Sequence, residues 1–291
     1  MAPRDTLFLI AINLIWGLTP LVLKFGMAEM PPLLMMALRF VLASVLLARL
    51  MRWHGGQMRR LLAIALTGGA LGFACLAAGL ARVGTMAPVG IANQLNVPFA
   101  VLLSILMLGE VVRWRRWLGM GLAFAGGVLV AFDPRVTDHL DGFTLVTLAA
   151  LLNAVSIILM RGVKNVRPLE LQAWLAQISW PVLLVLSLVF EPHPLAAIAA
   201  AGWPAWFAMA FGALGTTMIA HAGFYYIVQR YEVSKVAPFL LLSPLFTVLF
   251  GVALMGDQLT WRIALGGTMT LVGVTIINLR DKHVVEDQVT P

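Results

Sequence analysis

Two matched sets of five apolar segments constrain the fold of this chain more than any other feature. The block from Gly109 to Trp114 recurs 147 positions later as Gly256 to Trp261, with small, acidic and aromatic residues in register. Two glycines follow each block at matching positions, Gly119 and Gly126 in the first copy and Gly266 and Gly273 in the second. Five crossings reverse the direction of a chain, so the second copy is expected to enter a bilayer inverted. Inverted repeats are typical of secondary transporters with a substrate site near the membrane midplane.

The hydrophobic content of the chain excludes a water-soluble fold. Of its 291 residues, 61% are hydrophobic and 11% are charged, which is far from the composition of soluble domains. A helix needs about 20 apolar residues to cross the hydrocarbon core of a bilayer. Ten such segments are predicted, near residues 5–25, 31–52, 59–80, 84–108, 114–132, 142–163, 168–190, 204–229, 233–255 and 260–279.

The predicted fold is therefore an all-α integral membrane protein. Its ten transmembrane helices form two inverted five-helix repeats around a central cavity. The first repeat is expected over residues 5–133 and the second over 142–279, followed by a polar cytoplasmic tail at 280–291. The second copy holds about ten extra residues, which we expect between its second and third helices.

The basic residues lie in alternate connections and predict the orientation. Fifteen Lys and Arg residues fall on the side that holds the N-terminus, whereas the other side has Lys24, Arg82, Arg135 and Arg262. By the positive-inside rule both termini are cytoplasmic. The net charge of +7 does not indicate a nucleic-acid partner, because the basic residues are not gathered on one face.

Polar side chains inside the spans are the candidates for a substrate site, because hydrocarbon disfavours polar groups that face neither a partner nor water. We predict substrate-binding roles for Asn13, Trp16, Asn93, Asn96, Asn153, Ser156, Thr217, His221 and Tyr225. Five of them, Trp16, Asn93, Asn96, Asn153 and His221, are expected to share one cavity. The alternative for Asn93 and Asn96 is hydrogen bonding between helices, worth about 0.6 kcal/mol each, and for Trp16 it is packing against lipid.

His221 and Arg39 are the candidates for coupling transport to an energy source. Histidine changes its charge most readily near physiological pH, although His221 could equally be a neutral, hydrogen-bonded residue of the pocket. Arg39 lies two turns inside the second span. It could bind a carboxylate, snorkel to the interface, or form a structural ion pair.

Catalytic and metal-binding motifs are missing from the sequence. It contains no Gly-x-Ser-x-Gly, His-Glu-x-x-His or phosphate-binding Gly-x-x-x-x-Gly-Lys-Ser/Thr pattern, which disfavours an enzyme or an ATP-driven pump. The single cysteine, Cys75, cannot build a metal site alone. We therefore predict no catalytic residue, no metal and no cofactor. A purely structural membrane protein would not need so many amides at midplane depth.

Over nearly its whole length the sequence resembles the drug/metabolite transporter superfamily, in particular the EamA type with two five-helix repeats. The resemblance rests on segments Asn13–Gly17, Leu38–Phe40, Gly109–Glu110, Arg230–Glu232, Val236–Pro238, Ser243–Pro244 and Gly256–Leu259. It implies a central cavity between helices one, three, four, six, eight and nine, and a place in the bacterial inner (plasma) membrane. Two departures are Asp257, where glutamate is usual, and Asn153, where an aromatic residue is common.

The later segments look most like bacterial amino-acid-metabolite exporters of this family. The expected function is therefore export of small amphipathic metabolites, such as amino acids or their derivatives, by alternating access. The alternative is export of drugs or lipophilic cations, as in the small multidrug resistance proteins, which depend on a membrane-buried glutamate. No Asp or Glu lies deep in any predicted span, which favours a neutral or zwitterionic cargo. The expected partners are this small molecule and membrane lipids, with the protein a monomer or homodimer.

Overall fold

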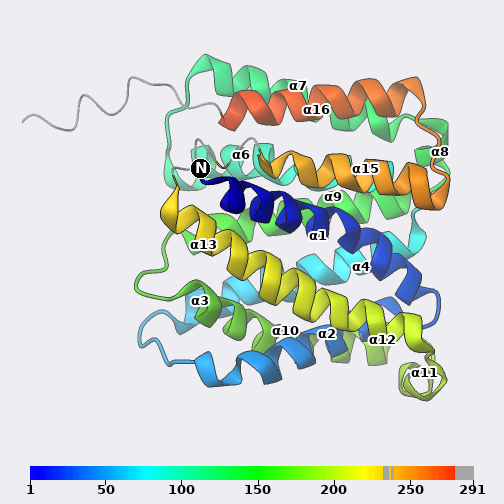
Figure 1. Cartoon of the computed structure of the whole chain (residues 1–291). Coiled ribbons are helices and arrows are strands. Elements are labelled where there is room, and N and C mark those ends of the chain that lie inside the picture. The colour runs from blue at the N-terminus through cyan, green and yellow to red at the C-terminus, as the bar shows by residue number, and fades with distance from the viewer. Residues whose placement is uncertain (232–235, 237–238, 279–291) are drawn as a thin grey trace, which may run out of the picture.

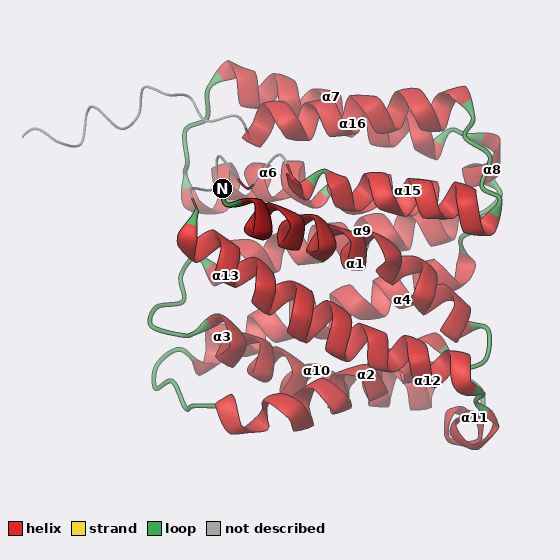
Figure 2. Cartoon of the chain, viewed as in Figure 1, coloured by secondary structure: helices red, strands yellow, loops and turns green. Residues whose placement is uncertain are grey.

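The computed structural model of the chain describes residues 1–231, 236 and 239–278, without the side chains of Tyr225 and Gln229. Every regular element in this part is helical, and the long helices run side by side as a bundle (Figures 1 and 2). The predicted tail at 280–291 lies outside the described residues.

The two halves of the chain contribute similar series of helices. The first half forms α1 (Pro3–Met27), α2 (Pro32–Leu47), η1 (Ala48–Leu50), α3 (Met58–Ile64), η2 (Ala65–Leu71), α4 (Gly72–Arg82), α5 (Ala87–Gln94), α6 (Asn96–Leu108), α7 (Trp114–Ala131) and the short α8 (Pro134–Thr137). The second half forms α9 (Leu140–Met160), α10 (Pro168–Phe190), α11 (Pro194–Ala200), α12 (Trp203–Ala210), η3 (Phe211–His221), α13 (Ala222–Arg230), α15 (Leu242–Met255) and α16 (Trp261–Asn278). The short α11 occupies the place where the extra residues of the second copy were expected.

Seven helices in the described part are long and apolar enough to cross a membrane. They cover Pro3–Met27, Pro32–Leu50, Met58–Arg82, Ala87–Leu108, Leu140–Met160, Pro168–Phe190 and Trp203–Val228. Three further spans were expected: α7 and α16 have 18 residues each, and α15 is a shorter apolar helix of 14 residues. The chain is thus an all-helical, multi-pass membrane protein.

Two of the long helices contain a π-helical stretch at equivalent places. In the first half η2 joins α3 to α4, and in the second half η3 joins α12 to α13. The repeat offset of 147 positions maps residues 65–71 onto 212–218, which lie inside η3. Because π-helical segments widen the helix and occur mostly near functional sites, these two stretches direct attention to the side chains around them.

Helices α7 and α16 pack along a seam of glycines, side by side in Figure 1. A Cβ on Gly119 would lie 2.8 Å from the Gly273 carbonyl oxygen, and one on Gly273 would lie 2.5 Å from the Gly119 oxygen. Gly126 and Gly266 approach each other in the same reciprocal way, at 2.4 and 2.6 Å. Gly119 therefore contacts the repeat equivalent of Gly126, and Gly126 contacts the repeat equivalent of Gly119. This reciprocity characterises interfaces with twofold symmetry.

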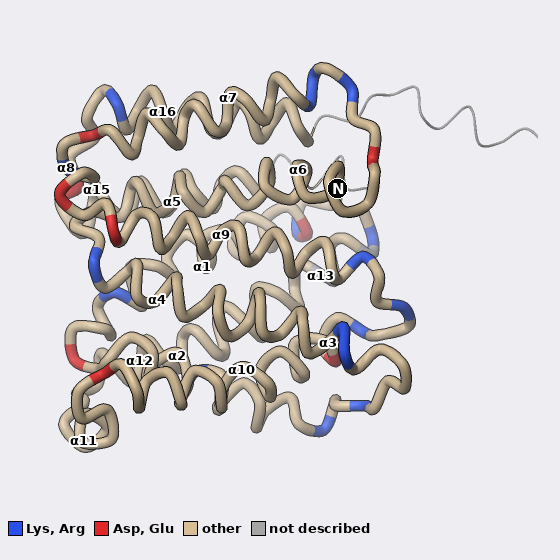
Figure 3. Tube along the Cα trace, turned by 180° about the vertical axis from the view of Figure 1, so that it is seen from behind, with Lys and Arg blue, Asp and Glu red and all other residues tan. Residues whose placement is uncertain are grey.

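Lys and Arg gather at the end of the bundle that holds the N-terminus (Figure 3). We call this the basic end, and its connections carry Arg49, Arg52, Arg59, Arg60, Arg113, Arg115, Arg116, Arg161, Lys164 and Arg167. The opposite end carries acidic residues together with the few basic ones, which are Lys24, Arg82, Arg135 and Arg262. The charge asymmetry read from the sequence thus coincides with the two ends of a single bundle.

Candidate functional site

Three of the predicted site residues meet at a small cavity inside the bundle. Asn93, Asn96 and Asn153 line a space of about 100 Å³ that we call the amide cavity. Its remaining lining residues are Gly68, Gly72, Phe73, Leu76, Ala149 and Ala150. The side chains come from η2 and α4, from α5 and α6, and from α9. The two halves of the chain therefore both contribute to this cavity.

A break in the fourth long helix positions two of these amides. Pro98 has no N–H to donate to the carbonyl oxygen of Gln94, and its ring is incompatible with a regular helix at that oxygen. Accordingly α5 ends at Gln94, α6 begins at Asn96, and the N–H of Leu95 donates to the Ala92 oxygen in a tighter turn over 3.1 Å. The break places Asn93 and Asn96 on either side of an irregular turn.

A larger cleft leads from the basic end toward the amide cavity. It has a volume of about 300 Å³, and Asn96 lines both spaces. Arg161 donates a hydrogen bond to the Glu110 carboxylate at this cleft, and Ser104 and Arg116 also line it. Asn96 is therefore the residue shared by the inner cavity and the cleft at the basic end.

At the opposite end of the same long helix, the carboxylate of Asp257 caps the N-terminus of α5. Its Oδ2 accepts hydrogen bonds from the N–H groups of Met86 over 2.6 Å and of Ala87 over 2.9 Å. These groups lie at the N-terminus of α5, where a carboxylate also interacts favourably with the helix dipole. A cavity beside it, lined in part by Pro88 and Phe143, has a volume of only about 10 Å³.

Trp16 and His221 form a second cluster, outside the residues that line the amide cavity. The Trp16 ring lies edge-on to His221 at 5.5 Å and to Phe224 at 5.4 Å between centroids. His221 Nδ1 donates to the backbone oxygen of Thr216 over 2.6 Å. A carbonyl oxygen only accepts, so this bond places a hydrogen on Nδ1. Of the five residues expected in one cavity, the structure thus brings Asn93, Asn96 and Asn153 together and places Trp16 and His221 in a separate cluster.

Arg39 and Thr217 form a third cluster between α2 and η3. The guanidinium is 1% exposed, and Nη2 donates to Thr217 Oγ1 over 3.5 Å. The side chain ends in the interior of the bundle, so Arg39 does not snorkel to the interface. Within the part of the chain that the structure describes, Arg39 makes no ion pair with an Asp or Glu.

Asn13 and Ser156 donate hydrogen bonds to backbone oxygens and do not line the amide cavity. Asn13 is fully buried, its Nδ2 donates to the Leu9 oxygen over 2.8 Å, and its Oδ1 has no partner. Ser156 donates to the Ile64 oxygen over 3.4 Å, in the contact between α9 and α3. The side chain of Tyr225 lies outside the described residues. The sequence analysis did not identify Phe73 as a residue of the cavity. The only sign of its role in the sequence is its position close to the glycines of η2.

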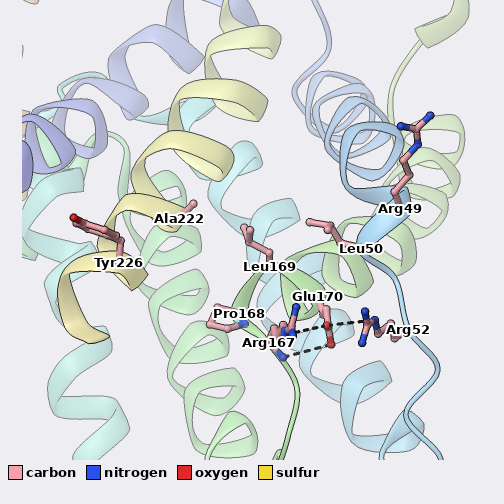
Figure 4. Close-up of a pocket in the computed structure, with 9 residues that line it drawn as sticks. All are labelled: Arg49, Leu50, Arg52, Arg167, Pro168, Leu169, Glu170, Ala222 and Tyr226. Carbon is pink, nitrogen blue, oxygen red and sulfur yellow. Dashed lines mark hydrogen bonds and ion pairs between the residues drawn. The ribbon is translucent and has the colours of Figure 1, made fainter. Parts of the chain in front are cut away.

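A further cleft, larger than the amide cavity, contains none of the predicted residues. It has a volume of about 440 Å³ and opens at the basic end. Figure 4 shows Ala222 and Tyr226 of α13 on one side and Arg49 and Leu50 on the other. Glu170 forms ion pairs with Arg52 and Arg167 at 3.9 Å each and contacts His54 at 3.1 Å. The Glu170 carboxylate therefore compensates part of the positive charge at this cleft. Although the cleft is larger than the amide cavity, none of the residues predicted to bind substrate lines it, so the amide cavity stays the candidate site.

Comparison with known families identifies the type of protein. The EamA-like transporter family matches the chain twice, over residues 5–132 and 140–279. The chain belongs to this family. Membership makes it a drug/metabolite transporter of the EamA type, with two copies of the family's domain.

Its relatives include membrane transporters of several bacteria. A protein of Escherichia coli (strain K12) named probable amino-acid metabolite efflux pump is 26% identical over 290 residues, covering 95% of each chain. An uncharacterized transporter of Synechocystis, sll0355, is 28% identical and covers 96% of this chain and 91% of its own length. The uncharacterized inner membrane transporter YedA of E. coli is 25% identical, over 87% of this chain and 83% of that protein.

A solved crystal structure shares the fold. It aligns with a TM-score of 0.61 at 18% identity, covering 95% of this chain and 96% of the other. The family and these relatives support a membrane transporter of metabolites.

Proposed function

We propose that this protein exports small amphipathic metabolites, such as amino acids or their derivatives, as a secondary transporter. The amide cavity is the observation that carries the proposal. Carboxamides offer both donors and acceptors, so they can hydrogen-bond an ammonium and a carboxylate without carrying charge. Phe73, Leu76 and the two alanines supply apolar surface beside them. A small cavity with a few converging polar groups on an apolar lining is the usual form of a metabolite site.

We further propose alternating access by two inverted repeats of five spans each. The reciprocal glycine seam and the matched π-helical stretches support a twofold relation between the halves. The cleft shared with the amide cavity through Asn96 lies at the basic end, while Asp257 caps α5 at the opposite end. This arrangement favours a state that is open toward the basic end. Transport then requires a second state in which the basic end closes and the Asp257 contact opens.

The basic end is proposed to face the cytoplasm, with both termini there. This follows from the positive-inside rule and from the separation of charges in Figure 3. Reporter fusions after Arg135 should be external and fusions after Lys164 internal. The reverse result at either position would contradict this orientation.

Transport by inside-out vesicles tests the function. Vesicles that contain the protein should take up labelled amino acids from a panel. Uptake would be measured both with and without an imposed proton gradient. Asn93→Ala and Asn96→Ala should reduce uptake about tenfold or more, because each removes hydrogen bonds to a polar cargo. Gln94→Ala is the matched control, since Gln94 lies on the same turn but does not line the amide cavity. Uptake of a lipophilic cation such as ethidium in place of the amino acids would favour the multidrug alternative.

His221 remains our proposed coupling residue if protons drive export. It packs against the ring of Trp16 on α1, and among the described residues its Nε2 makes no hydrogen bond. His221→Gln keeps a hydrogen-bonding side chain but removes the titrating group. The variant should still exchange cargo down its gradient but lose accumulation driven by a proton gradient. Unchanged accumulation would exclude the coupling role.

A further inference from the structure

The guanidinium of Arg39 is a buried charge whose hydrogen-bonding capacity is largely unused. Nη2 makes one long contact with Thr217, and among the described residues Nε and Nη1 have no hydrogen-bond partner. Arginine stays protonated in proteins. The middle of α2 thus holds a full positive charge, and among the described residues no carboxylate lies within ion-pair distance of it.

The surroundings of Arg39 hold the charge in place without neutralising it. The Cζ atom lies 4.9 Å from the centre of the Phe73 ring and 5.7 Å from that of Phe40. Gly212 leaves room for the side chain, because a Cβ there would come within 2.8 Å of Arg39 Cδ. Aromatic faces attract a cation less strongly than a carboxylate does in a desolvated site. A buried charge without an opposite partner is costly, so this position favours the binding of an anion.

Phe73 contacts both this charge and the amide cavity. It lines the cavity, and its ring packs edge-on against Phe40 at 5.0 Å as well as against the guanidinium. Its side chain therefore contacts both the cavity and the Arg39 guanidinium. Phe73 follows directly after Gly72 and the π-helical η2, where the backbone hydrogen bonding departs from that of a regular α-helix.

We propose that Arg39 binds the carboxylate of the transported molecule when Phe73 moves aside, while the amide cavity holds the other polar groups of that molecule. This rests on the proposed function and narrows the cargo to molecules that carry a carboxylate. The planar guanidinium matches a carboxylate in geometry and charge. The bound cargo supplies the counter-charge that the protein does not.

Paired acids and amides test the assignment. Exchange in proteoliposomes would be measured for L-leucine, L-threonine and L-phenylalanine, each beside its carboxamide. The wild type should exchange the acids about tenfold to a hundredfold faster than the amides, as expected for a hydrogen bond to a buried charge. In Arg39→Gln this preference should disappear. Arg59→Gln, an exposed arginine at the basic end, should retain it.

The outcomes separate this assignment from the proposed function. Exchange of amides as fast as acids by the wild type would overturn the role of Arg39 and leave metabolite transport standing. Exchange of none of the six compounds would overturn both. If Arg39→Gln does not fold, judged by size-exclusion chromatography, Arg39→Lys replaces it. Lysine keeps the charge but lacks the planar fork, so a reduced acid preference supports the proposal and an unchanged preference overturns it.

Discussion

The turn at Gly109 and Glu110 and its repeat equivalent at Gly256 and Asp257 have the same backbone but different partners. Both glycines are left-handed, with φ, ψ of 67°, 23° and 71°, 24°. In both turns the N–H of the acidic residue donates to a carbonyl oxygen six residues earlier, over 3.3 Å in Glu110 and 3.1 Å in Asp257. Asp257 is buried against the start of α5, whereas Glu110 meets Arg161 beside the open cleft.

The difference shows that the two repeats share the backbone of the turn but not the partner of its carboxylate. Left-handed glycine ends both helices in the same way, so each turn presents an acid to the bundle. At the opposite end that acid satisfies two backbone N–H groups of a broken helix. At the basic end it forms an exposed ion pair instead. In the proposed cycle, only the acid at the closed end caps a helix.

Cysteine labelling should give the largest contrast between the two ends. In a Cys75→Ala background, Ala100→Cys places a thiol in the cleft at the basic end, and Ala87→Cys places one beneath Asp257, where Ala87 is 1% exposed. A soluble maleimide should modify Cys at 100 at least about tenfold faster than at 87, because a buried thiol reacts only through local opening. Adding Asp257→Ala should speed labelling at 87. Equal rates at both positions would contradict the closed end.

Removing the buried carboxylate should cost the most stability. Asp257→Ala leaves the N–H groups of Met86 and Ala87 without their acceptor, at a cost of about 1–3 kcal/mol. Asp257→Asn keeps an acceptor oxygen and should cost less. Thermal unfolding in detergent measures both, with Leu259→Ala at an exposed neighbouring position as the control. If Asp257→Ala melts like the control, the capping contact does not stabilise the closed end.

The two turn glycines should respond alike. A Cβ at Gly109 or at Gly256 would meet nothing within 4 Å, so the cost of alanine comes from the positive φ alone. Gly109→Ala and Gly256→Ala should each lose about 1 kcal/mol of unfolding free energy. A clear inequality between them would show that the turns differ in more than their carboxylate partners.

The Glu110 pair should give the smallest effect. The side chains of Arg161 and Glu110 are 51% and 39% exposed, and exposed ion pairs contribute less than about 1 kcal/mol. A double-mutant cycle of Glu110→Gln and Arg161→Gln should give a coupling that falls toward zero in high salt. A salt-resistant coupling would mean that this end is also desolvated and closed.

The helical, multi-pass character of the chain followed from hydropathy, because a bilayer leaves few ways to satisfy backbone groups. The meeting of Asn93, Asn96 and Asn153 followed from the same argument applied to side chains. The same argument failed for Asn13 and Ser156, which do not line the cavity. Asn13 bonds to the Leu9 oxygen of its own helix, and Ser156 bonds to the Ile64 oxygen of a neighbouring helix. Sequence periodicity cannot distinguish that arrangement from a face turned toward a cavity.

The burial of Arg39 and the π-helical stretches could not be predicted for a different reason. An arginine two turns inside a span reaches the interface or the interior depending on which neighbour leaves space, and here Gly212, far away in the sequence, leaves it. A π-helical turn needs one additional residue per turn, which leaves no pattern in an apolar segment. Both features depend on packing between segments far apart in the chain.

The glycine seam of α7 and α16 has a consequence for how the protein could be made. All four of its close backbone contacts join one half of the chain to the other, and none requires the connection near Asp133 and Asp141 to be intact. Two polypeptides cut in that connection would each carry a complete surface for recognising the other. Produced together in one cell, they should find each other in the bilayer and assemble as a working pair.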